Sequence, residues 1–252
     1  MDSIVYFFCS KEIGRECLNF LLDNQAKFSI KIKAVFTNNR MLYEKSLSIR
    51  KLCERNSIKV YNSQNALSEL PNPDYLISIQ YHEIIKKEYL EKVKFCPINL
   101  HMAPLPKYRG CNQFSFAIYN KEKIFGTTLH FMDSNIDNGD ILFQKKFRIK
   151  GEFVSELYEQ TFKESYELFR ENIEKYFNGD FQAISQSSYK EKPSFYLRSD
   201  IERIKAITND MNIEEKKRRF KATYFPPFSP PFLVTNEGKI PLDMKWFRDL
   251  RD

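Results

Sequence analysis

The first hundred residues alternate between short apolar runs and amphipathic helical stretches, and this alternation constrains the fold more than any other feature of the sequence. A continuous apolar run is typical of a strand that is buried on both faces of a sheet. Residues 4–9 form such a run, and residues 30–36, 58–61 and 75–79 are also predicted to be strands. Helical patterns follow three of them: Ile13, Cys17, Phe20 and Leu21 on one side of a helix, then residues 47–55 and 84–93. We therefore expect an α/β fold, doubly wound around a mostly parallel sheet.

A second pattern begins after the first hundred residues. Residues 126–132 and 141–149 are rich in β-forming residues and are separated by a turn-forming segment, which predicts two adjacent strands. Apolar residues then recur at three-to-four spacing over residues 158–177. This spacing predicts a long amphipathic helix that packs on the sheet, with Ser155 as its N-cap and Asn178-Gly179 as its C-cap.

The last sixty residues differ in composition from the rest. We expect a catalytic domain over residues 1–192 and an extension over residues 193–252, made of a short helix at 199–208 and a β-hairpin at 232–240. The extension is dense in Phe, Tyr and Pro for so small an element. That density suggests that it meets a ligand base or another subunit.

Composition excludes several classes of protein. The sequence has no run of about eighteen uncharged apolar residues and no secretory signal, so neither a membrane span nor export is expected. Its five cysteines are scattered, without a Cys-x-x-Cys pair, and are expected to be buried thiols of a cytoplasmic protein. The net charge is 40 − 33 = +7. This excess favours an anionic partner, for which a phosphorylated small molecule serves as well as RNA. Residues 216–219 are the one concentrated basic run.

Three polar residues form the best candidate for catalysis. Asn99 and His101 alternate in an extended segment that follows the fourth strand-helix unit, so their side chains point to the same face. An amide N–H can stabilise a developing oxyanion, and an imidazole can exchange a proton near neutral pH. The turn that carries Asp137 supplies a carboxylate that can orient the imidazole or hold a water. Without a Ser or Cys nucleophile, the set predicts direct attack by the substrate's own nucleophile.

Two competing interpretations concern the other polar residues nearby. His130 and His82 are read as packed or surface histidines, because a lone histidine is more often structural. Residues 133–137 resemble the start of a calcium-binding loop, but the segment lacks the glycine at the sixth position and the terminal Glu of such a loop. We therefore expect no metal site.

The motifs around this set resemble the core of the 10-formyltetrahydrofolate-dependent formyltransferases. They are Asn99-x-His101, the segment Pro-Leu-Pro-Lys-Tyr-Arg-Gly at 104–110, Gly-Thr-Thr-Leu-His at 126–130 and Ile-Asp-Asn-Gly-Asp-Ile-Leu at 136–142. The resemblance is strongest over residues 75–150. It implies a Rossmann-like formyltransferase fold with Asn99, His101 and Asp137 as the catalytic triad, and it selects Asp137 over Asp140.

The resemblance also implies a cofactor, 10-formyltetrahydrofolate, and the place where its pterin ring would bind. Backbone recognition suits a pterin, whose donor and acceptor edge pairs with peptide groups much as a strand does. The residues implied in this contact are His82, Glu83, Ile85, Met132, Asp133 and Ser134.

The amine that receives the formyl group is less closely defined. Glycinamide ribonucleotide enzymes use a glycine-rich loop after the first strand, but residues 9–14 contain one glycine. Methionyl-tRNA enzymes carry a larger C-terminal barrel than the remaining residues allow. Residues 221–228 instead look like part of the C-terminal hairpin of bacterial sugar N-formyltransferases, which act on nucleotide-linked amino sugars and dimerise. The residues expected to bind such a substrate are Ser10, Lys11, Tyr81, Lys107, Arg109, Tyr224 and Phe225.

Our first choice of substrate is dTDP-4-amino-4,6-dideoxyglucose, formylated for an O-antigen or another surface glycan by a homodimeric enzyme. The alternatives are dTDP-3-amino-3,6-dideoxyhexose, GDP-perosamine, methionyl-tRNA, and a basic binding protein that keeps a non-catalytic formyltransferase core. The preference among the sugars rests on the resemblance alone.

Overall fold

The computed structural model describes residues 2–38 and 44–250, which form two compact units. The first unit consists of residues 1–101, 127–145 and 164–190, and the second of residues 102–126, 146–163 and 191–252. The last boundary between the two units falls between residues 190 and 191, close to the boundary expected after residue 192. Residues 102–126 and 146–163 belong to the same unit as the C-terminal extension.

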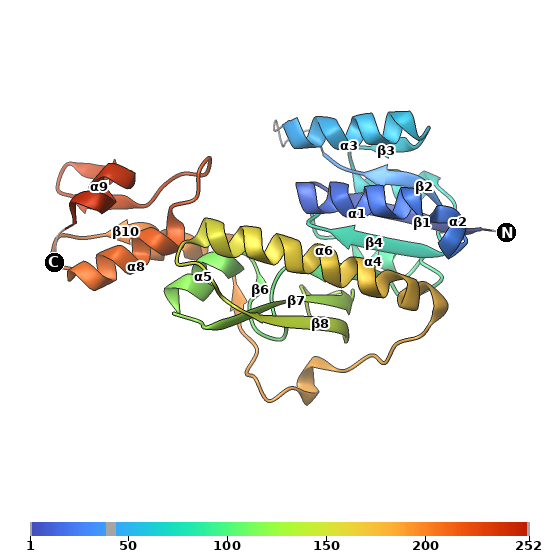
Figure 1. Ribbon diagram of the computed structural model, residues 1–252. Coiled ribbons are helices and arrows are strands. Elements are labelled where there is room, and N and C mark those ends of the chain that lie inside the picture. Colours follow the sequence, from blue (N-terminus) through green and yellow to red (C-terminus); the bar gives the residue numbers. More distant parts are fainter. Residues whose placement is uncertain (1, 39–43, 251–252) are drawn as a thin grey trace. The chain divides into compact units, whose positions relative to one another are not determined.

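A seven-stranded sheet contains the core of the described chain (Figure 1). Its order is β3-β2-β1-β4-β5-β7-β8, and β7 is antiparallel to β5 while the strands from β3 to β5 are parallel. The strands are β1 (Ser3–Cys9), β2 (Ile30–Phe36), β3 (Lys59–Tyr61), β4 (Tyr75–Ile79), β5 (Ile98–His101), β7 (Ile124–Phe131) and β8 (Ile141–Arg148). The expected α/β class, the mostly parallel sheet and the adjacent last two strands are confirmed.

The apolar runs form central strands because both faces of the sheet are covered. Phe8 and Phe36 are fully buried and stack with their ring centroids 4.2 Å apart on one face. On the other face lie Phe7 and Val35, which are also fully buried. The helices with residues in the first unit are α1 (Glu12–Asp23), α2 (Gln25–Phe28), α3 (Glu44–Arg55), α4 (Lys87–Leu90) and the C-terminal part of α6 (Val154–Asn178). Short 3-10 turns, η1 (Gln64–Glu69) and η2 (Gln186–Ser188), complete the unit.

The second unit is built from short helices and two small sheets. A core of Ile207, Phe220 and Leu242 joins them. Its helices are α5 (Gln113–Tyr119), η3 (Arg198–Asp200), α7 (Ile201–Lys205), α8 (Ile213–Thr223) and α9 (Met244–Asp249). Its paired strands are β6 (Arg109–Gly110) with β9 (Phe195–Tyr196), and β10 (Ala206–Ile207) with β11 (Phe232–Thr235) and β12 (Gly238–Pro241). The expected hairpin is confirmed as β11 and β12.

Three local expectations were wrong. The helix expected over 84–93 is reduced to α4, because Gln64 binds the backbone on either side of Ile85 and keeps it extended. Ser155 lies inside α6 and does not cap it; the Glu156 carboxylate instead accepts hydrogen bonds from the N–H groups of Glu152 and Phe153. The helix expected over 199–208 is divided into η3, α7 and the strand β10.

The cysteines were also only partly as expected. Cys9, Cys17 and Cys53 are buried, and burial raises the pKa of the Cys53 thiol to about 12. Cys96 is exposed and Cys111 is half-buried, so the expectation of five buried thiols was wrong. In the described part of the chain, no helix is both long and apolar enough to span a bilayer.

Candidate active site

The end of strand β5 places two side chains of the candidate site. Asn99 and His101 are two residues apart in β5, so they lie on one face of the sheet. In the antiparallel pairing with β7, Asn99 is opposite His130 and His101 is opposite Thr128. Because directly opposite residues share a face, this register adds His130 to the pair.

A turn between β7 and β8 supplies the carboxylate. Asp137 adopts a left-handed conformation with φ of 50°, which Asp tolerates better than most residues. The carboxylate of Asp133 stabilises the turn by accepting hydrogen bonds from the backbone N–H of Asn135 at 2.7 Å and from Asn138 Nδ2 at 3.2 Å. The acidic residue Asp133 thus has a structural role in shaping the turn.

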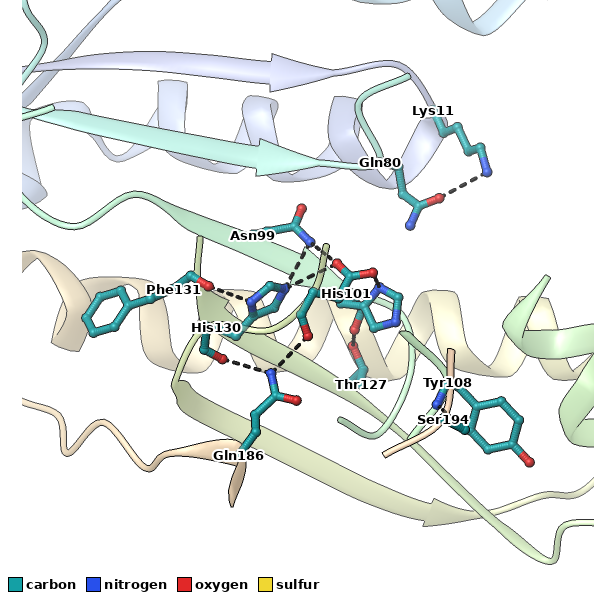
Figure 2. Close-up of polar contacts among 12 residues, drawn as sticks. Lys11, Gln80, Asn99, His101, Tyr108, Thr127, His130, Phe131, Gln186 and Ser194 are labelled. Atoms are coloured by element: carbon teal, nitrogen blue, oxygen red, sulfur yellow. Dashed lines mark hydrogen bonds and ion pairs between the residues drawn. The ribbon is translucent and has the colours of Figure 1, made fainter. Parts of the chain in front are cut away.

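The side chains from the strand and the turn converge on one carboxylate (Figure 2). His101 Nδ1 lies 3.5 Å from Asp137 Oδ2, and Asn99 Nδ2 lies 3.5 Å from Asp137 Oδ1. The side chains of His101 and Asp137 are 5% and 12% exposed. A carboxylate, an imidazole and an amide are therefore held together in a site that water only partly reaches.

His130 belongs to the same group of side chains, although its sequence gave no reason to place it there. Its Nδ1 lies 2.6 Å from the carbonyl oxygen of Phe131, so Nδ1 carries the proton and donates it. In the neutral ring Nε2 is then an acceptor, and it lies 3.2 Å from Asn99 Nδ2 and 3.6 Å from Asp137 Oδ1. This tautomer turns the Asn99 amide so that its nitrogen faces the site. His130 is packed, as expected, but it also orients a site residue.

A buried chain of hydroxyl groups fixes the end of β5. Ser165 of α6 donates to Thr127 Oγ1 at 2.7 Å, and Thr127 donates to the carbonyl oxygen of His101 at 3.3 Å. Both hydroxyl-bearing residues are fully buried. The backbone of His101 is therefore held from the helix layer, which limits the movement of its imidazole.

Comparisons with known proteins show the family to which the chain belongs. A model of the formyl transferase family matches residues 8–173, which is more than half of the chain. The chain belongs to this family. The methionyl-tRNA formyltransferase of Clostridium tetani is 31% identical over 205 residues, covering 75% of this chain and 65% of that enzyme. Two further relatives of that kind are matched over 49% and 40% of their length, so the chain spans less than two thirds of these relatives.

Solved structures of this family extend the likeness over nearly the whole chain. A sugar N-formyltransferase from Shewanella sp. FDAARGOS_354 has a TM-score of 0.80 at 21% identity and covers 97% of each chain. An N-formyltransferase from Helicobacter canadensis, solved in complex with folinic acid and dTDP-3-aminofucose, has a TM-score of 0.74 at 26% identity. The match covers 95% of this chain and 86% of that one. These structures bear out the expected formyltransferase fold.

The loops after β1 and β4 hold several of the residues expected to bind cofactor or substrate. Ser10 Oγ lies 3.1 Å from His82 Nδ1, and Lys11 Nζ donates to Gln80 Oε1 at 3.0 Å. Glu83 and Tyr81 both contact His82. Glu83 Oε1 lies 3.2 Å from His82 Nε2, and the ring of Tyr81 packs edge-on against the His82 ring. Burial first, and the Glu83 carboxylate second, raise the pKa of the Tyr81 hydroxyl. Two side-chain contacts therefore tie these loops together.

Gln64 holds the second of these loops. It is 5% exposed, its Nε2 donates to the carbonyl oxygen of Ile84 at 2.9 Å, and its Oε1 accepts from the N–H of Lys86 at 2.9 Å. Within the described residues, no main-chain hydrogen bond engages the N–H or C=O group of Glu83 or Ile85, although Ile85 is 6% exposed. The buried peptide groups of Ile85 require a partner, whereas Glu83 is exposed to solvent.

The second loop expected to contact the cofactor follows β7. The N–H of Met132 donates to the carbonyl oxygen of Pro97 at 2.8 Å, which joins this loop to the segment before β5. Asp133 and Ser134 are exposed, and the Asp133 carboxylate is used within the turn. This loop can therefore offer its peptide groups to a cofactor, as is expected of Glu83 and Ile85.

Four of the residues expected to bind substrate lie in the second unit, where each has contacts of its own. The Lys107 ammonium forms a salt bridge with Glu122, which also accepts a hydrogen bond from the buried Tyr108 hydroxyl. Arg109 pairs with β9 through its backbone. The remaining contacts are aromatic: Tyr224 stacks on Phe220, and Phe225 packs against Tyr158. The Lys107 charge is therefore already balanced by a carboxylate.

The basic run at 216–219 is part of helix α8, and two of its four residues pair with a carboxylate of the same helix. Glu215 pairs with both Arg218 and Arg219, and Arg219 also donates to the carbonyl oxygens of Arg203 and Ala206. These contacts give the two arginines a role in the packing of the second unit. In the parts of the chain that the structure describes, no cluster of three His, Cys, Asp or Glu side chains forms a metal-ligand set.

Gly139 is expected to be essential for the shape of the Asp137 turn. A Cβ at this position would lie 2.1 Å from the carbonyl oxygen of Phe131 and 2.7 Å from its carbonyl carbon. Because both atoms belong to the backbone of β7, Gly139→Ala must displace the turn, and it should lower the free energy of unfolding by about 1–3 kcal/mol. Denaturant unfolding measures the loss. Gly179→Asn is the control, because nothing lies within 4 Å and Asn tolerates its φ of +72°. Equal midpoints for the two variants would contradict the argument.

Proposed function

We propose that the protein transfers a formyl group from 10-formyltetrahydrofolate to the amine of a nucleotide-linked amino sugar. The observation that carries the proposal is the convergence of Asn99 and His101 on the Asp137 carboxylate, at 3.5 Å each. An amide donor, an imidazole and a carboxylate are the groups that acyl transfer to an amine requires when no residue acts as a covalent nucleophile.

Each of the three side chains has a distinct task in this proposal. Asn99 exchanges its 3.5 Å contact with Asp137 for the oxygen of the formyl group, to which it presents an N–H as negative charge develops there. His101, oriented through Nδ1 by Asp137, holds or accepts a proton at its other ring nitrogen. Asp137 balances the positive charge that His101 gains and can hold a water that carries the amine's proton away. The low exposure of the His101 and Asp137 side chains strengthens these interactions, because charges interact more strongly in a site with little water.

The folate, when bound, supplies the formyl group. The residues that we propose hold its pterin ring are those with open peptide groups in the loop after β4, Glu83 and Ile85, together with His82 and the loop that begins at Met132. Gln64 holds the first of these loops in place. The folinic acid in the Helicobacter canadensis structure supports a folate as the ligand.

An amino sugar is the acceptor favoured by the comparisons. Among the solved structures, the sugar N-formyltransferase from Shewanella has a TM-score of 0.80, whereas the methionyl-tRNA formyltransferase from Clostridium thermocellum has a TM-score of 0.63. The Helicobacter canadensis structure contains dTDP-3-aminofucose. We propose an amino-dideoxy sugar linked to a nucleoside diphosphate, with dTDP-4-amino-4,6-dideoxyglucose as the first candidate and 3-amino sugars and GDP-perosamine next. A homodimer in the cytoplasm that serves O-antigen or related glycan synthesis completes the proposal.

Formylation of methionyl-tRNA is the second candidate, because the curated relative with 31% identity is such an enzyme. An activity panel separates the two. The protein is incubated with 10-formyltetrahydrofolate and either dTDP- or GDP-linked 3- and 4-amino sugars or charged initiator tRNA, and product mass is followed. We expect a mass gain of one formyl group on one sugar nucleotide. Formylated tRNA alone would replace the proposal with the second candidate, and no transfer to any acceptor would refute both.

Replacement of Gln64 is expected to weaken folate binding without slowing the chemical step. Gln64→Met keeps the length of the side chain but removes both hydrogen bonds to the loop backbone. The loss of two bonds in a partly buried loop, about 1.4 kcal/mol in net terms, should raise the KM for 10-formyltetrahydrofolate about tenfold. The kcat at saturation should change less than about twofold, because the catalytic side chains are on other segments.

The control for this prediction is Gln160→Met. Gln160 makes the same kind of contact in the second unit, where its Nε2 donates to the carbonyl oxygen of Arg148 at 2.9 Å and its Oε1 accepts from the N–H of Lys150 at 3.1 Å. Its replacement should leave the KM for the folate unchanged. An unchanged KM in Gln64→Met, or equal increases in the two variants, would show that Gln64 does not shape the folate loop.

A further inference from the structure

Gln186 contacts the turn that carries the catalytic carboxylate from a distant part of the chain. Its Nε2 donates to the carbonyl oxygen of Asp137 at 2.9 Å and to that of Gly139 at 2.8 Å (Figure 2). Gln186 is 4% exposed. A single buried amide group therefore satisfies two carbonyl oxygens of one turn, at positions 49 and 47 residues earlier in the sequence.

The backbone around Gln186 is itself fixed in place beside the turn. Ile184 and Ile141 exchange two backbone hydrogen bonds, of 2.8 and 2.9 Å, which attach the segment after α6 to the start of β8. Ser185 then caps the 3-10 turn η2, which begins at Gln186, by accepting from the N–H of Ser187. The side-chain amide of Gln186 therefore extends from a segment whose backbone is held by hydrogen bonds on the N-terminal side of Gln186.

The turn requires such a contact because its conformation is uncommon. Asp137 has φ of 50°, and the conformation costs free energy for a residue other than glycine unless its surroundings maintain it. Gln186 binds the carbonyl oxygen of the residue that carries the carboxylate. A rotation of the Asp137 backbone would therefore turn this carboxylate away from His101 and Asn99. Gly139 lies close to the backbone of Phe131, and Gln186 donates to the carbonyl oxygens of both Asp137 and Gly139.

We infer that Gln186 is a positioning residue for catalysis, which holds the backbone of Asp137 so that its carboxylate stays directed at His101 and Asn99. The inference rests on the proposed function, because it assigns to Gln186 an effect on the reaction through Asp137. Gln186 acts through the main chain of Asp137, whose carbonyl oxygen accepts its hydrogen bond.

The kinetic test uses the full-length protein and the variant Gln186→Met, which matches the length of glutamine and cannot donate. A misplacement of about 1 Å can cost up to about a hundredfold in rate, so we expect kcat to fall about tenfold to a hundredfold. Both KM values should stay within about twofold, since the binding loops are not altered. Gln160→Met, which removes two similar bonds from another turn, should keep kcat within about twofold of the wild type. A Gln186→Met protein with wild-type kcat would overturn the inference.

A double-mutant cycle distinguishes positioning of Asp137 from a general loss of structure. If Gln186 acts through the Asp137 carboxylate, Gln186→Met should change kcat less than about twofold when Asp137→Asn is already present. An equal factor in both backgrounds would refute the positioning role. Gln186→Glu adds a pH signature: its carboxyl group can donate to a carbonyl oxygen only when protonated, so its kcat relative to that of the wild type should rise as the pH is lowered. A flat ratio would count against the inference.

Hydrogen exchange tests the contact without any assay of activity. In Gln186→Met, the amides of residues 138–140 should exchange at least about tenfold faster than in the wild type, because the turn opens more often. In Gln160→Met their exchange should not change. Unchanged exchange in Gln186→Met would refute the inference and leave the proposed function standing. A wild-type protein without formyl transfer would refute the proposed function, while faster exchange would still establish that Gln186 holds the turn.

Discussion

Replacement of Asp137 by asparagine is expected to lower kcat/KM for formyl transfer about a thousandfold, or about 4 kcal/mol in transition-state free energy. The substitution removes the charge that orients His101 and balances its positive form, while it keeps the size of the side chain. Asparagine also tolerates the left-handed backbone at this position, where φ is 50°. The main-chain contacts with Gln186 do not depend on the side chain. The loss therefore reports on the carboxylate alone, and steady-state kinetics with the sugar nucleotide identified by the activity panel measure it.

Asp140→Asn is the matched control for this prediction. Asp140 lies in the same turn, its side chain is exposed, and its backbone carbonyl accepts the hydrogen bond from the N–H of Phe131. The same change of charge, three residues away, should leave kcat/KM within about twofold of the wild type. If Asp140→Asn were the slower enzyme, the assignment of the carboxylate to Asp137 would be wrong.

Strands β1 and β4 could be predicted because each one is buried on both faces. A strand such as residues 75–79 has no polar side, so its apolar run appears in the sequence without reference to any other element. The same applies to the pairing of Asn99 with His101, since two residues that alternate in a strand share a face in any sheet. These inferences needed local information only.

The rest of the site depends on contacts between distant segments. His130 meets Asn99 only through the antiparallel register of β5 and β7, and that register cannot be read from either strand alone. Gln64 and Gln186 are buried side chains that bind the backbone of loops 20 or more residues away. Glutamine is common on surfaces, so its residue type carries no signal of such a role. Sequence patterns could therefore indicate the candidate catalytic groups but not the residues that hold them.

The wrong helix over residues 84–93 has the same cause. Ile84 and Ile85 fit a helical pattern, but Gln64 binds the carbonyl oxygen of Ile84 and the N–H of Lys86, which a helix would use for its own bonds. Ile84 is 68% exposed, while Ile85 is buried. The contact with Gln64 thus overrides the local preference of these residues for a helix. We propose that this loop binds the cofactor, and peptide groups outside a helix are available for that contact.

Replacement of His101 by alanine is the second large effect that we expect. The imidazole is 5% exposed, its Nδ1 is directed at Asp137, and its backbone is held through Thr127 and Ser165. Removal of the group that holds or accepts the proton should lower kcat about a thousandfold, within the range typical of a general acid–base residue. The KM for the folate should change little, since the loop at 82–86 is not altered.

Chemical rescue distinguishes a proton-transfer role of His101 from a structural one. His101→Ala leaves a space of the size of an imidazole beside the Asp137 carboxylate, so added imidazole should restore part of the lost activity in a saturable manner. The same addition should not accelerate Asp137→Asn, where the imidazole ring is still present but its charge partner is missing. Thermal unfolding of His101→Ala should confirm that the variant is folded under assay conditions. A His101→Ala enzyme with near-normal kcat would remove the imidazole from the mechanism, whereas a slow but folded variant that imidazole does not rescue would limit His101 to orienting the substrate.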